Sequence, residues 1–310
     1  MKILVTGGAG FIGTTLVPML LDLQHDVTVF DSLMYRGDVL IPFFRRNGFH
    51  FIKGDVRDAE AVAAACEGKD VVIHLAAIVG LPACRENPEL AEAVNYGGSV
   101  NVSKGASDAH ALVIFGSTGS NYGEVVNQIC TEETPLNPLS IYGTTKTRAE
   151  QYIMEHNNAI AFRFATAFGL SPRLRLDLMV NDFTNLALKQ KYLVVYESWF
   201  MRTFIHVHDM CRAFVFAITH RDKMLGKVYN IGSDKMNFSK RDICDIIKAQ
   251  TGAYFHYADV GEDGDKRNYV VSYDKVKAIG YDTTITVQDG VKELVNALQV
   301  IKINNPYANV

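Results

Sequence analysis

A tyrosine and a lysine lie one helical turn apart in the segment Tyr142-Gly143-Thr144-Thr145-Lys146. On a helix this spacing places a phenol and an ammonium group on the same face. The pKa of a phenol in water is ~10, so it is a poor base at neutral pH unless a nearby cation lowers that value. A phenolate held by a lysine can take the proton of an alcohol while hydride leaves the same carbon. The pair therefore indicates oxidation of an alcohol.

A second pair with the same spacing, Tyr273 and Lys277, is expected on a surface helix. Only Tyr142 follows a strand-like run that leads to the edge of a sheet where active-site clefts open. Upstream of Tyr142, the hydroxyl residues Ser117 and Thr118 follow the apolar run that ends at Phe115. Their hydroxyls can hydrogen-bond a reacting alcohol. Serine, threonine, glycine and asparagine also favour turns, and the segment can serve both purposes.

The elements that must hold this chemistry begin at the first residues. An apolar run, Ile3-Leu4-Val5, leads into Thr6-Gly7-Gly8-Ala9-Gly10-Phe11-Ile12-Gly13, and a later run, Val27-Thr28-Val29-Phe30, ends in Asp31. Strand, glycine-rich turn, helix, strand and terminal acid together are typical of a dinucleotide-binding unit. The glycines allow close approach of a pyrophosphate to the helix N-terminus, and Asp31 can accept hydrogen bonds from an adenosine ribose.

Strand-like and helix-like segments alternate through the first half of the chain. After Asp31, strands are expected at 50–55, 71–76, 111–115 and 159–164, with helices at 58–66, 89–108 and 141–155. This alternation predicts an α/β fold with a Rossmann-type, doubly wound parallel sheet. The second half loses the rhythm. We expect residues 1–165 and about 204–232 to form the dinucleotide domain, and about 166–203 and 233–310 a smaller lobe.

Composition excludes several classes of function. A net charge of −3 gives no reason to expect a nucleic-acid or membrane partner. The longest apolar stretch, Val71 to Leu81, is too short to span a bilayer, and we expect no signal peptide, because strand-like residues begin at Lys2-Ile3. Five scattered cysteines indicate no disulfide framework and no metal site, so a reducing cytoplasm is expected. His74, His206 and His208 are interpreted as structural.

These motifs, in this order, resemble those of the extended short-chain dehydrogenase/reductases, and more narrowly the NAD-dependent epimerase/dehydratase family that modifies nucleotide sugars. The resemblance covers nearly the whole chain. It implies NAD as cofactor and a catalytic trio of Thr118, Tyr142 and Lys146. The residues that it assigns to the cofactor are Gly7, Gly10, Phe11, Ile12, Gly13, Asp31, Asp55, Val56, Leu75, Ala76, Ala77, Tyr142 and Lys146. No arginine or lysine directly follows Asp31, which favours NAD over NADP.

The resemblance also implies a nucleotide-diphosphate sugar as substrate. Arg202, before His206-Val207-His208-Asp209, resembles the family's first diphosphate-binding arginine, and Arg267, in Asp265-Lys266-Arg267-Asn268, resembles the second. Arginine suits this task because its charge is permanent and its donors are bidentate. The other expected substrate contacts are Val79, Thr118, Thr166, Asp177 and Leu178. Related enzymes form homodimers through the helices equivalent to 89–108 and 141–155, where Ala91, Val94, Val100, Ala149 and Ile153 are expected to pack.

Departures from subfamily patterns narrow the reaction. The 4,6-dehydratases place acids directly after the catalytic threonine, where this chain has Gly119 and Ser120, and the cysteine of the 3,5-epimerases is missing. Oxidation of one sugar hydroxyl, usually at C4, remains. Release of the 4-keto sugar would make the protein a 4-dehydrogenase, and return of the hydride to the other face a 4-epimerase. The segments 79–84 and 171–183 resemble bacterial GDP-heptose C4 dehydrogenases. A non-catalytic NAD sensor with this fold is the remaining alternative.

Overall fold

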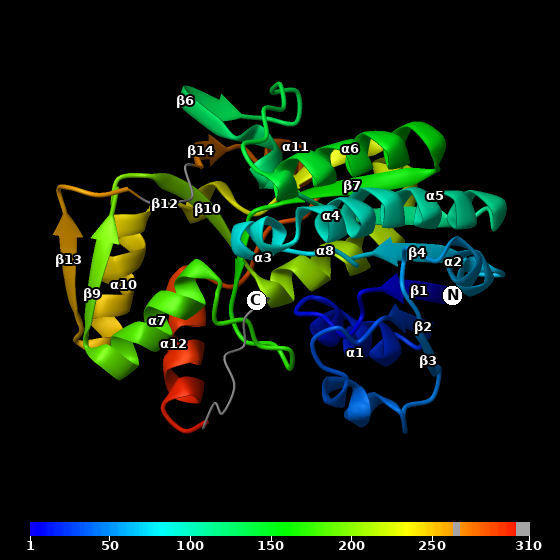
Figure 1. The fold of residues 1–310 in the computed structure, drawn as a ribbon, viewed down its shortest axis with the longest axis horizontal. Helices are drawn as coiled ribbons and strands as arrows, with labels where there is room; N and C mark the ends of the chain where they lie inside the picture. Colours follow the sequence, from blue (N-terminus) through cyan, green and yellow to red (C-terminus); the bar gives the residue numbers. More distant parts are fainter. Residues whose placement is uncertain (263–266, 302–310) are drawn as a thin grey trace.

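Seven parallel strands form the central sheet of the computed structural model, which describes residues 1–262 and 267–301 (Figure 1). Their order across the sheet is β11-β7-β5-β4-β1-β2-β3. Neighbouring strands pair in parallel from end to end, as in Ile3–Val71 and Ile3–Val27 on the two sides of β1. The strands are β1 (Lys2–Thr6), β2 (Asp26–Asp31), β3 (Phe49–Lys53), β4 (Val71–His74), β5 (Leu112–Thr118), β7 (Ala159–Phe164) and β11 (Lys227–Ile231).

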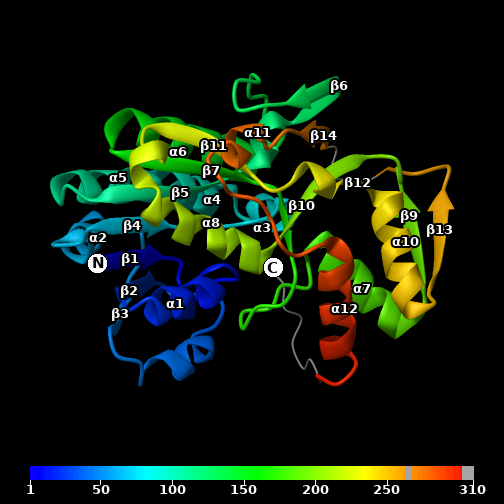
Figure 2. The same cartoon turned by 180° about the vertical axis from the view of Figure 1, so that it is seen from behind.

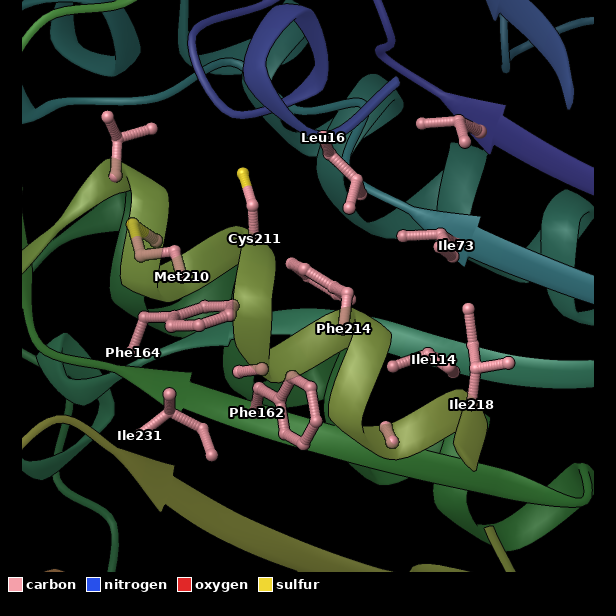
Figure 3. Packing of buried hydrophobic residues seen from close by; sticks show 14 of the residues in the cluster. Leu16, Ile73, Ile114, Phe162, Phe164, Met210, Cys211, Phe214, Ile218 and Ile231 are labelled. Atoms are coloured by element: carbon pink, nitrogen blue, oxygen red, sulfur yellow. The ribbon is translucent and has the colours of Figure 1, made fainter. Parts of the chain in front are cut away.

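Helices cover both faces of this sheet. One face packs against α1 (Gly13–Asp22) and α8 (Val207–Thr219), and the other against α2 (Ala59–Cys66), α5 (Gly98–Asp108) and α6 (Ile141–His156). Figure 3 shows Phe214 and Ile218 of α8 beside Ile73 and Ile114 of the strands. Burial on both faces explains why the strands are continuously apolar rather than alternating. The prediction of a Rossmann-type parallel sheet is confirmed.

The long helix expected at 89–108 is interrupted. It consists of α4 (Pro88–Glu92), a π-helical turn η2 (Ala93–Gly97) and α5. The turn contains Asn95, which is fully buried and whose side chain bonds the backbone N–H and C=O of Ile78 at 2.7 and 3.0 Å. Single π turns in helices are frequent at functional sites. Here the turn fixes the loop that follows β4.

A smaller lobe lies next to the carboxyl ends of the strands of the central sheet (Figure 2). It contains α7 (Met179–Gln190), α10 (Lys240–Thr251), α12 (Val287–Leu298) and the parallel pair β9 (Tyr192–Tyr196) and β13 (Tyr254–Ala258), around a core of their own. Capping boxes at Ser239 and Thr286 start α10 and α12. Strands β8 (Thr166–Phe168), β10 (Met201–His206) and β12 (Asn237–Ser239) form a three-stranded sheet.

Short elements complete the described chain. They are η1 (Asp38–Phe43), α3 (Leu81–Glu86), η3 (Gly119–Tyr122), β6 (Glu124–Cys130), α9 (Arg221–Met224), η4 (Asp234–Met236), β14 (Asn268–Val271) and α11 (Asp274–Lys277). Asp265, Lys266 and the end of the expected smaller lobe, 302–310, lie outside the described residues. No helix in the described ranges has the length and apolar content needed to cross a membrane.

The expected surface helix at Tyr273 is wrong. Tyr273 is fully buried in the larger core, its hydroxyl shares a 2.5 Å hydrogen bond with Thr203, and α11 is only one turn long. The tyrosine therefore anchors the chain after β14 to β10, the middle strand of the three-stranded sheet, while Lys277 bonds Asp234. A helical spacing of two residues does not report which of them faces water.

Four of the five residues expected to supply a dimer interface pack inside the chain, whereas the fifth, Val100, is half-buried. Ala91, Val94, Ala149 and Ile153 are buried between the helices and the sheet of one chain, because they point toward the core. The outward side of these helices carries Tyr96, Tyr152 and Arg148 instead, and the Arg148 guanidinium lies 3.9 Å from the centre of the Tyr96 ring. A homodimer stays a prediction, and these larger side chains are those that a partner would meet.

Candidate active site

A cleft of about 1110 Å³ opens at the carboxyl ends of the central strands, where they face the smaller lobe. The cleft is lined by residues at or directly after the ends of four strands, β1, β2, β4 and β5. These residues are Gly7, Asp31, Leu75 and Thr118, respectively. Ligands in open α/β sheets bind at this edge. Every residue that the sequence assigns to catalysis, cofactor or substrate lines this cleft.

The glycine-rich turn leaves no room for side chains. Gly7 has φ +71°, and a Cβ there would lie 2.6 Å from the backbone nitrogen of Ala76. A Cβ at Gly13 would lie 2.5 Å from the Cα of Gly8. The first turn of α1 has neither a side-chain cap nor an acidic residue, so the positive end of this helix can receive an anion. This cradle fits the pyrophosphate of a dinucleotide.

Asp31 holds this cradle in place. Its carboxylate accepts hydrogen bonds from the N–H groups of Ala9 at 2.9 Å and Leu33 at 2.8 Å. Burial raises the pKa of Asp31, and these two hydrogen bonds oppose that rise. Because a carboxylate has about four lone-pair positions, two remain for a ribose. Asp31 thus joins the turn to the end of β2.

The region expected to hold the adenine lies on the other side of β2. Val56 is buried against Gly98, where a Cβ would lie 2.5 Å from its Cγ2. The Asp55 carboxylate bonds the Arg57 guanidinium, with a closest contact of 2.6 Å, and this bond lowers the pKa of Asp55. Val56 can therefore supply an apolar wall for the adenine. The ion pair with Arg57 holds the Asp55 carboxylate toward the rim of the cleft.

The reacting centre brings Thr118, Tyr142 and Lys146 together from β5 and α6. Ser140 caps α6 by accepting the N–H of Gly143 at 3.1 Å, which places Tyr142 in the first turn. The Tyr142 phenol and the Thr118 hydroxyl line the same cleft. Burial raises the pKa of Tyr142, whereas hydrogen bonding to Thr118 and the charges of Arg175 and Arg267 lower it. The three groups can thus act on one alcohol.

Lys146 is held against an apolar wall. It is 2% exposed, and its Nζ lies 3.9 Å from the centre of the Phe115 ring. Behind it, Glu150 bonds Arg163 at 2.7 Å and accepts the Ser117 hydroxyl at 2.5 Å. Burial lowers the pKa of Lys146 to about 7, and the charge of Glu150 opposes this. The charge of Glu150 therefore favours the protonated form of the lysine.

Replacing Lys146 by methionine should abolish activity but stabilise the protein in acid. The pKa is about 7 in the fold and ~10.4 in an unfolded chain. The cost of burying the ammonium is therefore complete below pH 7 and disappears as the pH rises toward 10. We expect a higher free energy of unfolding for Lys146→Met below pH 7, measured by urea denaturation, and a difference that closes in alkali. An equal gain from Lys104→Met, an exposed change on α5, would contradict this reason.

Arginines gather on the substrate side of the cleft. Arg202 is 4% exposed and donates to the C=O of Met201 at 3.1 Å. Arg267 donates to the Ser120 hydroxyl at 2.8 Å. Thr166 has a buried hydroxyl with no hydrogen-bond partner among the described residues. A buried hydroxyl of this kind favours a bound ligand with a polar group.

Several cleft residues escaped the sequence prediction. Arg173 and Arg175 are 3% and 7% exposed, and the Arg175 guanidinium grips both oxygens of Asp177. Asp182 also lines the cleft, and burial together with the charge of Asp177 raises its pKa to about 6. Arg173, Arg175 and Asp182 lie in the segment 171–183. The sequence alone did not show that this segment lies over the cleft. The Ser171 hydroxyl donates to the C=O of Phe11 at 2.6 Å, which ties this segment to the glycine-rich turn.

The histidines hold elements together. His74 shares hydrogen bonds with the hydroxyls of Thr6 at 2.7 Å and Ser99 at 2.9 Å, and burial lowers its pKa to about 3. His206 accepts the N–H of His208 at 3.2 Å and contacts Glu293 at 2.7 Å. His74 therefore joins β4 to β1 and α5, and His206 starts α8.

Residues 3–232 match the model of the NAD dependent epimerase/dehydratase family. The chain belongs to this family. It is 30% identical to the low-salt glycan biosynthesis protein Agl12 of Haloferax volcanii over 308 residues, which cover 96% of this chain and 98% of that protein.

Two solved structures extend the similarity to the whole fold. A UDP-glucose 4-epimerase from Thermus thermophilus, in complex with NAD, superimposes with a TM-score of 0.83 at 25% identity, covering 97% of this chain and 99% of that one. DesIV, a dTDP-glucose 4,6-dehydratase from Streptomyces venezuelae with NAD and TYD bound, gives 0.85 at 25% identity and 96% coverage of both chains. As a member of the epimerase/dehydratase family, the protein is an NAD-dependent enzyme.

Asp31 should make this family member prefer NAD to NADP. Its carboxylate would repel a 2′-phosphate, and Ser32 offers no charge to neutralise one. We expect Asp31→Ala with Ser32→Arg to shift the ratio of the two dissociation constants by about tenfold or more toward NADP. Titration calorimetry of both cofactors measures this, with Ser32→Arg alone as control. Equal affinity of the unmutated protein for NAD and NADP would refute the assignment.

Proposed function

We propose that the protein oxidises the C4 hydroxyl of a nucleotide sugar with NAD and releases the 4-keto sugar, as a nucleotide-sugar 4-dehydrogenase. The observation that carries this proposal is the reacting centre itself. Thr118, Tyr142 and Lys146 meet in the cleft, while the two following positions hold Gly119 and Ser120, which cannot act as acid or base. Oxidation is the chemistry that this set supports without elimination.

Each side chain has one role in this reaction. The Thr118 hydroxyl holds the sugar oxygen, and the Tyr142 phenolate takes the proton of that hydroxyl at its Oη. The Lys146 ammonium favours the phenolate electrostatically. Bound NAD supplies the hydride acceptor. The apolar ring of Phe115 beside Lys146 excludes water, which strengthens the charge interaction.

The substrate end is proposed to be a nucleoside diphosphate bound between sheet and smaller lobe, with Arg202 on the phosphates and Thr166, Asp177 and Leu178 beside the sugar nucleotide. A GDP-sugar such as GDP-heptose is the candidate that we favour. Its support is that the two segments that resemble GDP-heptose C4 dehydrogenases, 79–84 and 171–183, both border the cleft. In this proposal, residues 1–165 and about 204–232 form the domain that binds NAD.

Replacing Arg202 by alanine should weaken the substrate and spare the cofactor. Loss of charge-assisted hydrogen bonds costs about 1.5–3 kcal/mol, so we expect the Michaelis constant to rise about 10- to 100-fold. The NAD content of the purified variant should stay unchanged. Steady-state kinetics and cofactor extraction measure both quantities, and the exposed Arg221→Ala is the control. A variant with lost NAD and an unchanged Michaelis constant would show that Arg202 serves the cofactor.

A 4-epimerase is the second candidate, favoured by the similarity to the Thermus thermophilus UDP-glucose 4-epimerase. The two differ in the fate of the keto sugar. We would incubate the NAD-loaded protein with GDP- and UDP-sugars and analyse the products by mass spectrometry. A dehydrogenase gives a sugar nucleotide lighter by two hydrogens and reduced cofactor, whereas an epimerase gives an isomer of equal mass. The absence of both products from every sugar tested would refute the proposal.

A further inference from the structure

Ser120 lies at the junction of two hydrogen bonds beside the reacting centre. It is 6% exposed, and its hydroxyl oxygen accepts the Thr118 hydroxyl at 3.1 Å and Nη1 of Arg267 at 2.8 Å. Its own N–H donates back to Thr118 at 3.1 Å. Thr118 and Tyr142 line the same cleft, and Thr118 is among the groups that lower the pKa of the phenol, so this row of hydrogen bonds extends from the Arg267 guanidinium to the hydroxyl that acts on Tyr142.

The backbone around Arg267 is fixed by the sheet that it enters. Asn268, the next residue, pairs with Glu124 at the start of β6, and its side-chain oxygen accepts the N–H of Met201 at 2.9 Å. Met201 in turn accepts a hydrogen bond from Arg202. Arg267 is thus attached both to the segment that carries Ser120 and to the strand that carries Arg202.

The row of hydrogen bonds has a direction. A guanidinium can only donate, whereas each hydroxyl can donate or accept. With Tyr142 protonated, the Thr118 hydroxyl donates to Ser120. When the phenol loses its proton, rotation of the two hydroxyls lets Ser120 donate to Thr118 and Thr118 donate to the phenolate, while Arg267 continues to donate to Ser120. Every donor then points toward the negative charge.

We propose that Ser120 and Arg267 are positioning residues that stabilise the ionised form of Tyr142 through Thr118. The inference rests on the proposed function, in which Tyr142 accepts the proton. In the proposed function Lys146 favours the phenolate from the same helix. Arg175, paired with Asp177, lowers the pKa of Tyr142 from the segment over the cleft, whereas Cys84 on α3 raises it. Arg267 adds a further cation from the segment that leads into β14.

The test is a titration of Tyr142 in the NAD-loaded protein without substrate. Tyrosine labelled with ¹³C at Cζ reports ionisation of each ring by NMR, and the signal missing from Tyr142→Phe assigns the resonance. We expect the pKa of Tyr142 to rise by about one unit in Arg267→Ala, since removal of a nearby cation shifts a pKa by this order. Ser120→Ala should give a smaller rise, and Arg267→Lys should restore most of the original value. Arg241→Ala, in the smaller lobe beside Tyr257, is the matched control and should change the titration of Tyr257 but leave that of Tyr142 unchanged.

Kinetics then separate this inference from its alternatives. We expect Arg267→Ala to lower kcat. The rate should increase with pH as Tyr142 ionises, and the midpoint of this increase should move to higher pH by the same amount as the pKa of Tyr142. A raised Michaelis constant with an unchanged Tyr142 titration would overturn the inference and make Arg267 a diphosphate ligand alone. Full activity of Tyr142→Phe would instead refute the proposed function, whatever Arg267 does.

Discussion

Tyr142→Phe is expected to lower turnover of the nucleotide sugar by about 10²- to 10⁴-fold, the range that general base catalysis contributes. The substitution keeps the ring but removes the oxygen that accepts the proton. The binding of NAD should change little, because the substitution leaves the glycine-rich turn and Asp31, which are proposed to bind the cofactor, unaltered. Steady-state kcat, with cofactor content of the purified variant, measures both effects.

Tyr273→Phe is the matched control for this loss. Tyr273 has the same spacing to a lysine, yet its hydroxyl bonds Thr203 inside the core. Its removal should lower stability by about 0.5–1.5 kcal/mol, as for one buried hydrogen bond, and leave kcat nearly unchanged. Near-normal turnover of Tyr142→Phe together with a slow Tyr273→Phe would show that the catalytic tyrosine has been misassigned.

Arg163→Met should lower the free energy of unfolding by about 3–5 kcal/mol, because it leaves the Glu150 carboxylate buried without its partner. Side chains of this pair are 7% and 3% exposed, and Arg163 also donates to the Tyr122 hydroxyl at 3.1 Å. Urea denaturation at neutral pH measures the loss.

The pair Arg148 and Glu92 offers a control with the same chemistry at the surface. Both side chains are 45% exposed. Exposed pairs contribute about 0–1 kcal/mol, so Arg148→Met should cost little. Equal losses in the free energy of unfolding from Arg163→Met and Arg148→Met would mean that burial does not increase the contribution of the Arg163–Glu150 pair to stability.

The sequence could predict the structural features that depend on residues close together in the chain. A glycine-rich turn between strand and helix depends on backbone space at Gly7 and Gly13, and continuous apolar runs such as 71–76 report burial on both faces. Both signals lie within a few neighbouring residues. The order of strands and the cleft at their carboxyl ends follow from these elements by general rules.

The parts that escaped prediction depend on contacts between distant segments. The place of Arg175 in the cleft depends on the tie between Ser171 and Phe11, which holds its segment beside the glycine-rich turn, and Ser120 has no sign of a partner until Arg267 arrives from the far end of the sequence. The π turn at Asn95 arises because the loop after β4 needs its amide. For the same reason Ala149 and Ile153 pack inward rather than toward a second chain.

Transfer of the C4 hydrogen tests the central claim most directly. The NAD-loaded protein would be mixed with a nucleotide sugar that carries deuterium at C4, and the cofactor and sugar would be separated and weighed by mass spectrometry. We predict that the reduced cofactor gains one deuterium, that the sugar becomes a 4-ketone, and that Tyr142→Phe transfers almost none in the same time. An isomer with inverted C4 that keeps its deuterium there would identify the 4-epimerase instead, whereas a sugar that is converted without inversion at C4 while its deuterium stays there, or whose deuterium appears in water, would contradict hydride transfer at this carbon.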